Sequence, residues 1–357
     1  MTAMAARSLG FHVHALDPDA SCAARFVVER CLMAEFDDDF AAADLARHCK
    51  VVTLEIEKVS IAALEAARRY APVRPGPRVL EIVQDRSLQK AWLKKNGFPV
   101  GDYKDARSGD EVKKACAALG ASFVKATTGG YDGQSQVRIS VPAEAEAAFT
   151  SLGSRPVVVE KGLAIERELS VLVARSPSGE IAVYDPALNH HENRILAWSA
   201  LPAPIPPPVA QQATGIARDI ATKLEIEGLL VVEFFHVAGG ALYVNELAPR
   251  PHNSFHATEI ACLTSQFEQH VRAVCDLPLG LTEVVRPAAI RNLLGDLWKG
   301  DKQPRFDAAL ALKGVRLHLY GKRVARPGRK MGHLSASGRT PEEAVTLVQE
   351  AYSRLSG

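Results

Sequence analysis

The first third of the chain alternates between helical and strand-like patterns of apolar residues. Apolar positions three and four apart predict helices over residues 2–10, 43–49 and 61–70. Apolar and polar residues alternate over residues 11–17 and 50–57, as expected of half-buried strands. Because helices and strands follow one another in turn, the pattern predicts a parallel sheet with flanking helices.

The rest of the chain is richer in strands. A helix is predicted over residues 85–97, where Asp85 is suited to cap the first turn. Two strands joined by a glycine-containing turn are predicted over residues 121–139, and again over 230–244. Further strands are expected within 155–176, 179–200 and 315–321, further helices at 209–228, 264–276 and 340–355, and proline-rich connections at 72–78 and 201–208.

Length, charge and cysteine usage narrow the class of protein. With 357 residues the chain is long enough for two or three domains, and its 47% hydrophobic and 24% charged residues are typical of globular proteins. A net charge of +2 and apolar runs no longer than a strand predict neither a nucleic-acid partner nor a membrane span. The six cysteines are scattered without a CxxC pair, which argues against a zinc site and favours a reducing, cytoplasmic setting.

A glycine-rich turn follows Lys125. Gly129, Gly130 and Gly133 punctuate the stretch "VKATTGGYDGQSQ". Backbone amides exposed by glycines can surround phosphate oxygens, and a neighbouring lysine adds a positive charge. The stretch is neither a Walker A nor a GxGxxG pattern, so a flexible hairpin without a ligand stays open as the alternative.

Two acids lie inside apolar runs on neighbouring predicted strands. Glu233 stands within "LLVVEFF", and Glu246 follows Asn245 in "LYVNELA". Carboxylate and amide oxygens suit Mg²⁺, which shares its coordination with substrate phosphates. Solvated acids at a strand edge are the alternative, but an unpaired carboxylate in an apolar run is costly, which favours a cation partner.

Basic residues and histidines gather at three further places. The stretch "KRVARPGRKMGH" concentrates six basic side chains around a Pro-Gly turn, and such a loop can hold a phosphate dianion. A solvated loop is an equal alternative. His190 and His191 stand at the end of a predicted strand, and His252 and His256 follow the proline-flanked Arg250. Their spacing does not require a metal, which would need three or four converging ligands, and contacts to a substrate fit as well.

Several segments occur in the order expected of one enzyme family. They are "QDRSLQK", "VKATTGGYDGQSQ", "VVVEKGLAIERELSVLVAR", "NHHENRIL", "VVEFF", "NELAPRPHNS", "TSQFEQHVRA", "NLLGD" and "HLYGKRVARPGRKMGH". Together they resemble 5-(carboxyamino)imidazole ribonucleotide synthase, an ATP-grasp enzyme of purine biosynthesis, over nearly the whole chain. "NELAPRPHNS" and "GRKMGH" are highly specific, whereas the other segments are shared with related ATP-grasp carboxylases and ligases.

The resemblance implies an ATP-grasp architecture that combines α/β and α+β parts. Residues 1–84 would form an N-terminal doubly wound domain, residues 85–282 an ATP-grasp domain with a mobile lid over about 101–199, and residues 283–357 a small α+β domain. The family pattern begins with a strand and "GGGQLGRM", and this chain begins at the final methionine of that pattern. The first strand and its glycine loop are therefore expected to be lacking.

The resemblance also implies a reaction. ATP would phosphorylate bicarbonate to carboxyphosphate, and the exocyclic amine of 5-aminoimidazole ribonucleotide would then be carboxylated. Mg²⁺, or alternatively Mn²⁺, would neutralise the triphosphate, and a closed site would protect the water-sensitive intermediate. The expected partners are these small molecules and a second copy of the chain in a homodimer. Two alternatives stay open: another ATP-grasp ligase, such as formate-dependent glycinamide ribonucleotide transformylase, and a non-catalytic nucleotide-binding relative.

The family pattern assigns residues to each ligand. Contacts to the ATP phosphates are implied for Arg86, Lys125, Gly130, Tyr131, Asp132, Gly133, Gln134, Ser135 and Gln136. The rest of the nucleotide would meet Glu160, Lys161, Gly162, Leu163, Glu168 and His191, and Asn245 would lie beside the metal ligands Glu233 and Glu246. Catalytic roles are implied for Asp132, Arg250, His252 and Asn253. The ribonucleotide would be bound by Glu55, Tyr131, Asp132, Arg250, His252, Lys322, Arg329 and Lys330.

Two positions depart from the family pattern. Ser135 and Phe255 stand where the family usually has glycine. A side chain at position 135 is expected to stiffen the phosphate loop, because it removes backbone conformations open to glycine. The ring at position 255 is expected to add bulk beside the substrate pocket.

Overall fold

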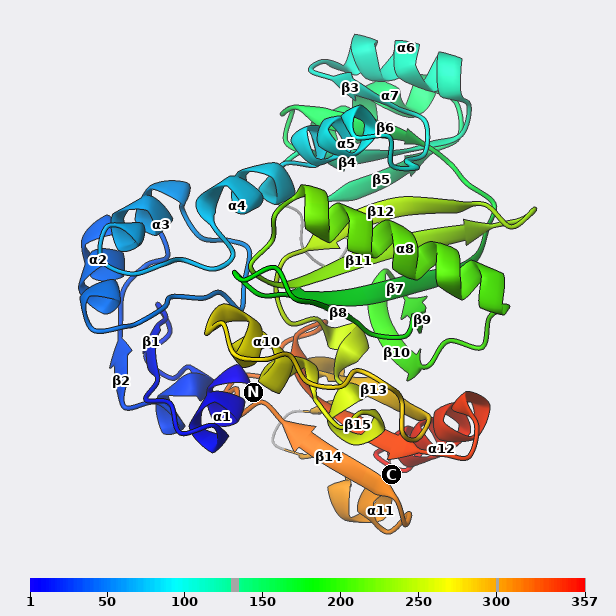
Figure 1. Ribbon diagram of the computed structural model, residues 1–357. Helices are drawn as coiled ribbons and strands as arrows, with labels where there is room; N and C mark the ends of the chain where they lie inside the picture. Colours follow the sequence, from blue (N-terminus) through cyan, green and yellow to red (C-terminus); the bar gives the residue numbers. More distant parts are fainter. Residues whose placement is uncertain (130–134, 300–301, 357) are drawn as a thin grey trace. The chain divides into compact units, whose positions relative to one another are not determined.

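The computed structural model describes residues 1–129, 135–299 and 302–356 (Figure 1). The chain divides into two compact units. Unit 1 comprises Met1–Pro77, Leu169–Val231 and Ala248–Gly357, and unit 2 comprises Arg78–Glu168 and Val232–Leu247.

Unit 1 begins with a small α/β arrangement. Strands β1 (His14–Leu16) and β2 (Arg30–Leu32) pair in parallel, with the helices α1 (Thr2–Ser8), α2 (Asp39–Arg47) and α3 (Ile61–Arg68) around them. The side chains of Asp38 and Ser60 accept hydrogen bonds from the first turns of α2 and α3, which explains where these helices begin. All three predicted helices and a strand within residues 11–17 are confirmed, but the parallel partner of that strand is β2, which was not predicted.

The strand predicted over residues 50–57 is wrong. Only Val52 forms a bridge, in parallel with Val73, and the backbone beyond it makes no ladder. Val52 and Leu54 are nevertheless buried, so the alternating pattern correctly marked which side chains point inward. Alternation reports burial, whereas a strand also needs a neighbour whose backbone groups match its own.

A nine-stranded sheet carries most of the remaining strands, and its order is β12-β11-β7-β9-β10-β13-β15-β14, with β8 beside β7. Its strands are β7 (Ile165–Arg175), β8 (Ile181–Val183), β9 (Ala187–Glu192), β10 (Ile195–Leu201), β11 (Gly228–Val237), β12 (Leu242–Ala248), β13 (Ala288–Leu294), β14 (Val315–Leu319) and β15 (Lys330–Ser337). The adjacent positions of β11 and β12 confirm the predicted hairpin. Gly239 and Gly240 close its turn with φ of 90° and 87°, a region that favours glycine.

The C-terminal part of the sheet is covered by the last helix, α12 (Pro341–Ser353). Strands β10, β13, β15 and β14 are antiparallel to their neighbours, and α12 lies across β13 and β15 (Figure 1). Ala344, Val348 and Ala351 recur on the buried face of α12, and they pack against apolar residues of these strands. The remaining helices of unit 1 are η1 (Ala23–Phe26), α8 (Pro207–Lys223), η3 (Asn253–Phe255), α9 (Thr258–Ala261), α10 (Gln266–Val274), η4 (Gly295–Leu297) and α11 (Phe306–Leu310).

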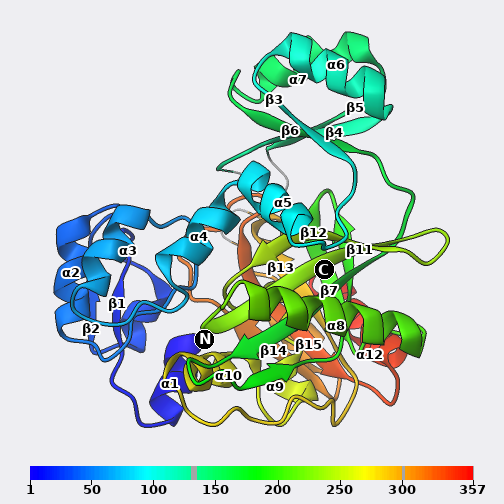
Figure 2. The same cartoon turned by 45° about the horizontal axis from the view of Figure 1, so that its top comes forward.

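Unit 2 contains a four-stranded antiparallel sheet of order β3-β6-β4-β5. The strands are β3 (Tyr103–Ala106), β4 (Ser122–Ala126), β5 (Gln136–Ile139) and β6 (Val157–Lys161). Helices α6 (Gly109–Leu119) and α7 (Ala145–Ser151) lie side by side on one face of this sheet (Figure 2). Before the sheet come α4 (Pro77–Gln84) and α5 (Arg86–Lys95), so the proline-rich connection ends earlier than predicted because proline is well suited to a first helical turn.

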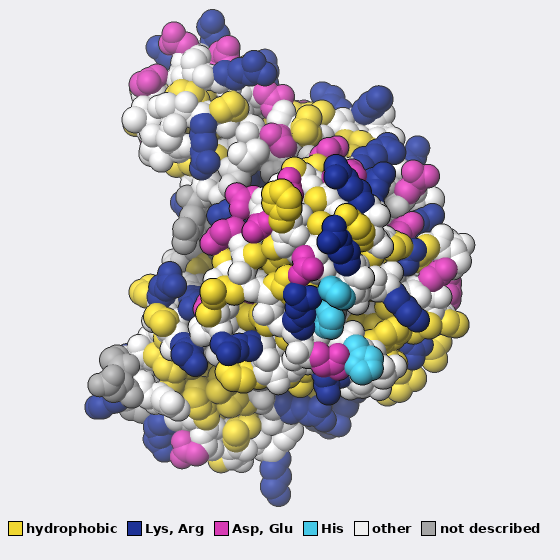
Figure 3. Space-filling view, turned by 90° about the vertical axis from the view of Figure 1, so that its left-hand side faces the viewer, with side chains coloured by type: hydrophobic (Ala, Val, Ile, Leu, Met, Phe, Trp, Pro, Cys, Tyr) yellow, Lys and Arg dark blue, Asp and Glu magenta, His cyan; other side chains and the backbone are white. Residues whose placement is uncertain are grey.

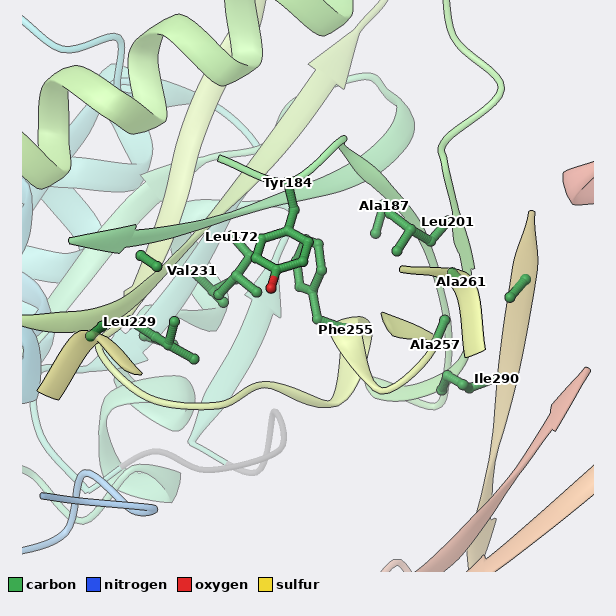
Figure 4. Close-up of a cluster of buried hydrophobic side chains, with 14 residues drawn as sticks. Leu172, Tyr184, Ala187, Leu201, Leu229, Val231, Phe255, Ala257, Ala261 and Ile290 are labelled. Atoms are coloured by element: carbon green, nitrogen blue, oxygen red, sulfur yellow. The ribbon is translucent and has the colours of Figure 1, made fainter. Parts of the chain in front are cut away.

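The core of unit 1 accommodates Phe255. Its ring is fully buried and meets Tyr184 edge-on at 6.2 Å between ring centroids, with Leu172 and Val231 beside them (Figure 4). The ring thus contributes to the core, and the expectation that it adds bulk beside the substrate pocket stays a prediction. Its apolar surface is better placed in a cluster of aliphatic side chains, where it is removed from water.

The surface shows no strong bias of charge on the face drawn in Figure 3, where lysine and arginine side chains are interspersed with aspartate and glutamate. This mixture agrees with the net charge of +2. Among the described residues, no helix has the length and apolar character needed to cross a membrane.

Candidate active site

Two lysines and a glutamate meet in the interior of unit 2. The Nζ atoms of Lys90 and Lys125 lie 3.3 and 3.1 Å from the same oxygen of Glu160, Oε2. The Lys90 side chain is only 4% exposed, and those of Lys125 and Glu160 are 12% and 13% exposed. We call these three residues the Glu160 cluster.

Three elements bring the Glu160 cluster together. Lys90 stands on α5, whose first turn is capped by the carboxylate of Asp85 as predicted. Lys125 is on β4 and Glu160 on β6, and the antiparallel register places Phe123 opposite Glu160. Lys125 and Glu160 are therefore diagonal neighbours on one face of the sheet, within reach of long side chains.

Burial and charge act in opposite directions on these groups. Desolvation lowers the pKa of Lys90, and the attraction of Glu160 offsets only part of that effect. Burial also raises the pKa of Glu160, but the neighbouring Lys125 and Lys90 outweigh it and hold that pKa below its ordinary value. Glu160 is thus a stable carboxylate at neutral pH.

Two contacts in unit 2 join the residues that the family pattern assigns to the phosphates and the metal, which are Arg86, Glu233, Asn245 and Glu246. Arg86 Nη2 lies 3.8 Å from Glu246 Oε2, and Asn245 Nδ2 donates to Glu233 Oε2 at 3.2 Å. Glu246 is half-exposed, and Arg86 also donates to the carbonyl of Ala126 beside Lys125. Within the described residues, no group of three or more His, Cys, Asp or Glu side chains is arranged to hold a metal ion. A cation at these acids would need further ligands from a bound substrate.

The strand that was assigned to the adenine leaves the sheet of unit 2 after Lys161. Lys161 is exposed and lies 3.7 Å from Asp102, and the Gly162 N–H donates to the carbonyl of Ala121. Leu163 is half-buried at the end of this stretch, and Glu168 lies on β7.

The phosphate loop is described only from its two ends. Gln136 begins β5 opposite Lys125, and the Ser135 hydroxyl donates to the carbonyl of Gly129 at 3.5 Å. The assignments that fall on Gly130, Tyr131, Asp132, Gly133 and Gln134 lie outside the described residues.

In unit 1, Arg250 pairs with a glutamate. Its Nε atom lies 2.9 Å from Glu57 Oε1, and both side chains are mostly buried. The family pattern assigned the nearby Glu55 to the ribonucleotide, and its carboxylate accepts a hydrogen bond from the Thr2 N–H at 3.2 Å. The two acids are two residues apart, so alternation alone could not separate them.

A chain of hydrogen bonds leads to His252. Asn189 donates to the Ser170 hydroxyl at 3.1 Å, Ser170 donates to the Ser254 hydroxyl at 2.9 Å, and Ser254 Oγ lies 2.8 Å from His252 Nδ1. The Ser254 backbone N–H also points at Nδ1, at 3.4 Å. Nδ1 is therefore the acceptor, which leaves the proton of the neutral ring on Nε2.

The charge state of His252 follows from its surroundings. Burial lowers its pKa well below the ordinary value, and the positive charges of Arg250 and Lys330 add to the effect. The ring is accordingly neutral at physiological pH and offers Nε2–H as a donor. Asn253 begins the short helix η3 that follows, and His191 lies near the end of β9, at a strand end as predicted.

The basic residues near the C-terminus form a loop over residues 322–330, here called the basic loop. Lys322 Nζ donates to the carbonyl of Lys330, and Arg329 Nη1 donates to the carbonyl of Val324, both at 2.8 Å. The loop is anchored from "NLLGD": the Gly295 N–H donates to the Arg329 carbonyl at 2.8 Å, and Asp296 Oδ2 accepts from the Gly328 N–H at 2.7 Å.

A cavity of about 560 Å³ adjoins the basic loop within unit 1. Its lining consists of Pro18, Asp19, Ser21, Glu35, Arg323, Val324, Arg326 and Arg329. Hydrogen bonds from Ser21 lower the pKa of Asp19, and the nearby Arg329 and Arg323 lower it further. Arg329 therefore faces a space large enough for a small ligand.

Four residues of these sites were missed from the sequence. Lys90 follows Arg86 by four residues, a spacing that puts both on one helical face and could have indicated it. Glu57, Ser170 and Ser254 carried no local signal, because their partners lie far away in the chain.

Family models match three consecutive parts of the chain. The ribonucleotide synthetase preATP-grasp domain matches residues 1–84, the ATP-grasp domain matches residues 91–267, and the phosphoribosylaminoimidazole carboxylase C-terminal domain matches residues 288–346. The expected ATP-grasp architecture is thereby confirmed.

Curated relatives match over the full length. The chain is 41% identical to the N5-carboxyaminoimidazole ribonucleotide synthase of Brucella melitensis over 94% of this chain and 92% of that protein. It is 37% identical to the synthase of Bacillus subtilis over 100% of this chain and 93% of that protein.

Solved structures agree with these relatives. An ADP complex of purK, an N5-carboxyaminoimidazole ribonucleotide synthetase, superposes with a TM-score of 0.92 at 37% identity, covering 98% of this chain and 92% of that one. The Aspergillus clavatus synthase in complex with ADP and 5-aminoimidazole ribonucleotide superposes with a TM-score of 0.91 at 28% identity, covering 99% and 95%. The chain therefore belongs to the N5-carboxyaminoimidazole ribonucleotide synthase family of ATP-grasp ligases.

Proposed function

We propose that this protein uses ATP and bicarbonate to carboxylate the exocyclic amine of 5-aminoimidazole ribonucleotide in purine biosynthesis. The observation that carries the proposal is membership of the synthase family over the whole chain. The γ-phosphoryl group of ATP would pass to a bicarbonate oxygen, giving carboxyphosphate and ADP. The amine would then attack the carboxyl carbon, phosphate would leave, and the amine nitrogen would lose a proton.

Most of the residues assigned to the nucleotide belong to unit 2, and one of them, His191, belongs to unit 1. Arg86 and Lys125 lie near each other, since Arg86 bonds to the carbonyl next to Lys125, and both can face phosphate oxygens. The loop from Gly130 to Gln136 would enclose the phosphates. The stretch from Glu160 to Leu163 would border the adenine, with Glu168 at the ribose and His191 beside the nucleotide.

A divalent cation is assigned to Glu233 and Glu246 on the neighbouring strands β11 and β12. Their carboxylates, with the Asn245 amide alongside, are the oxygen donors that Mg²⁺ prefers, and Mn²⁺ could replace it. When bound, the ion would neutralise part of the negative charge of the phosphates. Two protein carboxylates leave several positions for phosphate oxygens, which supports a metal that arrives with the nucleotide.

Bicarbonate and the imidazole are assigned to Arg250, His252 and Asn253, with Tyr131 and Asp132. The Arg250 guanidinium is held in place by Glu57, and a guanidinium suits a bicarbonate or carboxyphosphate oxygen. His252 is neutral and would donate from Nε2 to the same group, which would stabilise the charge that develops on it. Its hydrogen-bond chain to Ser254 fixes the ring in this tautomer.

The phosphate of the ribonucleotide is assigned to the basic loop. Lys322, Arg329 and Lys330 offer the positive charge that a phosphate monoester needs, and Arg329 faces the adjoining cavity. We retain Glu55 as a candidate for the ribose. The contact between Arg250 and Glu57 supports Glu57 as a further candidate for the ribose.

We also propose the domain limits 1–84, 85–282 and 283–357, with a lid over about 101–199 that closes on the nucleotide. The ranges of the three family models support this division. A homodimer in the cytoplasm is the proposed form. Light scattering during size-exclusion chromatography would test it, and a mass of one chain at micromolar concentration would exclude the dimer.

The experiment that tests the function is an ATPase assay with purified protein. Phosphate release should require both bicarbonate and 5-aminoimidazole ribonucleotide. Stimulation only by formate and glycinamide ribonucleotide would establish the transformylase instead. Nucleotide binding without turnover under every condition would establish a non-catalytic relative.

A further inference from the structure

The Glu160 cluster of unit 2 contains one more cation than it needs for an ion pair. A single carboxylate oxygen, Glu160 Oε2, faces the ammonium groups of both Lys90 and Lys125. One carboxylate neutralises one ammonium, so the three residues carry a net charge of +1 in a place from which water is largely excluded. Such a charge is costly unless further anions offset it. Glu246 also favours the charged form of Lys90, and a bound phosphate would add to that effect.

The two lysines are not equivalent. Lys90 projects from α5 and is almost entirely buried. Lys125 stands at the end of β4, one residue before Ala126, whose carbonyl accepts a hydrogen bond from Arg86. Lys125 therefore lies near a second cation, Arg86, and shortly before the glycine-rich stretch in the sequence. Lys90 is more deeply buried.

We propose that Lys90 is a positioning residue of the nucleotide site, which keeps Glu160 neutralised so that Lys125 can turn from Glu160 to a nucleotide phosphate. The inference rests on the proposed assignment of Lys125 to the phosphates. Without Lys90, a nucleotide would have to separate Lys125 from a buried carboxylate that has lost its second cation. That carboxylate would hold Lys125 more firmly, and phosphate would bind more weakly.

A purely structural ion pair is the competing explanation. A lysine and a glutamate would suffice for it, and buried ion pairs contribute little to stability compared with apolar residues of similar size. Burial lowers the pKa of Lys90 despite the nearby Glu160, so its buried position does not favour its charge. This agrees with a role for Lys90 other than stabilising the fold.

The test compares Lys90→Met, Lys90→Gln and Lys90→Arg with Lys95→Met, an exposed lysine on the same helix. Binding of ADP with Mg²⁺ is measured by calorimetry, and thermal unfolding is recorded for each variant. Removing the charge should weaken ADP binding about tenfold or more, because a charge-assisted contact is worth roughly 1.5–3 kcal/mol. Lys90→Arg should stay within about threefold and Lys95→Met within about twofold of the unmodified protein.

If Lys90→Met does not fold, Lys90→Gln is the decisive variant, because the glutamine amide can still donate to Glu160 but carries no charge. Unchanged ADP affinity in Lys90→Gln, with only a lower melting temperature, would overturn the proposal in favour of a structural pair. The KM for the ribonucleotide should not change in any of these variants. Because ADP binding is measured without turnover, the result stands even if the carboxylation assay fails.

Discussion

The charge states of individual side chains in this protein are set by their immediate neighbours. Glu160 is surrounded by cations that keep it ionised, whereas His252 is buried beside Arg250 and stays neutral. Burial penalises the charged form of both groups, but only Glu160 has counter-ions to overcome it. The two charge states follow from the neighbours rather than from the residue types.

The clearest prediction for a single residue concerns Glu246. Glu246→Gln keeps the shape of the side chain and removes its negative charge, so a divalent cation at the phosphates would be held poorly. Turnover at saturating Mg²⁺ should fall about a hundredfold or more, with an unchanged melting temperature. Steady-state kinetics would be compared with Glu65→Gln, an exposed glutamate on α3 that has no proposed role. Normal activity of Glu246→Gln would remove this residue from the metal site.

A second prediction concerns Arg329. Arg329→Ala should raise the KM for the ribonucleotide by about ten- to a hundredfold, since a charge-assisted contact contributes roughly 1.5–3 kcal/mol. The KM for ATP should be nearly unchanged. Arg316→Ala, an exposed arginine on β14, is the matched control. A higher KM for ATP with a normal KM for the ribonucleotide would show that the basic loop serves the nucleotide instead.

Between elements, the basic loop depends on the turn that follows β13. Gly295 and Asp296 bind the backbone of Arg329 and Gly328, so they fix where the loop runs. A Cβ at position 295 would lie 2.6 Å from the Arg326 backbone nitrogen, which only glycine avoids. The stretch "NLLGD" thus has a physical role in holding the loop.

The prediction for this element uses Asp296→Ala, which removes the acceptor of the Gly328 N–H. The hydrogen bond is worth about 0.5–1.5 kcal/mol, so the KM for the ribonucleotide should rise roughly two- to tenfold. Hydrogen exchange of residues 322–330 should become faster, while α12 should stay protected. Asp307→Ala, on the neighbouring helix α11, serves as the control. An unchanged exchange rate in the loop would refute the anchor.

At the scale of the whole molecule, five histidines of unit 1 share a lowered pKa. Burial lowers the pKa of His252, His256, His270, His318 and His333, to about 4 for His270 and about 3 for His333. Folding keeps these rings neutral, whereas the unfolded chain protonates them near the ordinary value of 6.5. Their contribution to stability is fully present above pH 6.5 and is lost as the pH falls towards 4 and 3.

Acid should therefore destabilise unit 1 independently of any effect of pH on catalysis. At pH 5 each of His270 and His333 should have cost unit 1 roughly 2 kcal/mol of unfolding free energy compared with pH 7.5. Hydrogen exchange of β13 and β15, corrected for the intrinsic effect of pH, measures this loss. His333→Gln should reduce the dependence on pH, and the exposed His48→Gln should not. An equal pH dependence in His333→Gln would contradict the argument.

The sequence determined the features that depend on near neighbours. The cap of α5 at Asp85, the helices α2 and α3, and the hairpin of β11 and β12 could be predicted, because each follows from local periodicity, capping and turn chemistry. The order of the family motifs along the chain also indicates the ATP-grasp fold and the synthase family.

Only the tertiary structure decided which distant residues meet. Residues 50–57 have the alternation of a strand, but no neighbouring backbone matches them beyond Val52. Lys90 and Glu160 are 70 positions apart, and Ser170 and Ser254 are 84 apart, so their contacts depend on how α5, β6, β7 and η3 pack. Local patterns specify which side chains point inward, whereas the partner that an inward polar group finds is set by the packing of whole elements.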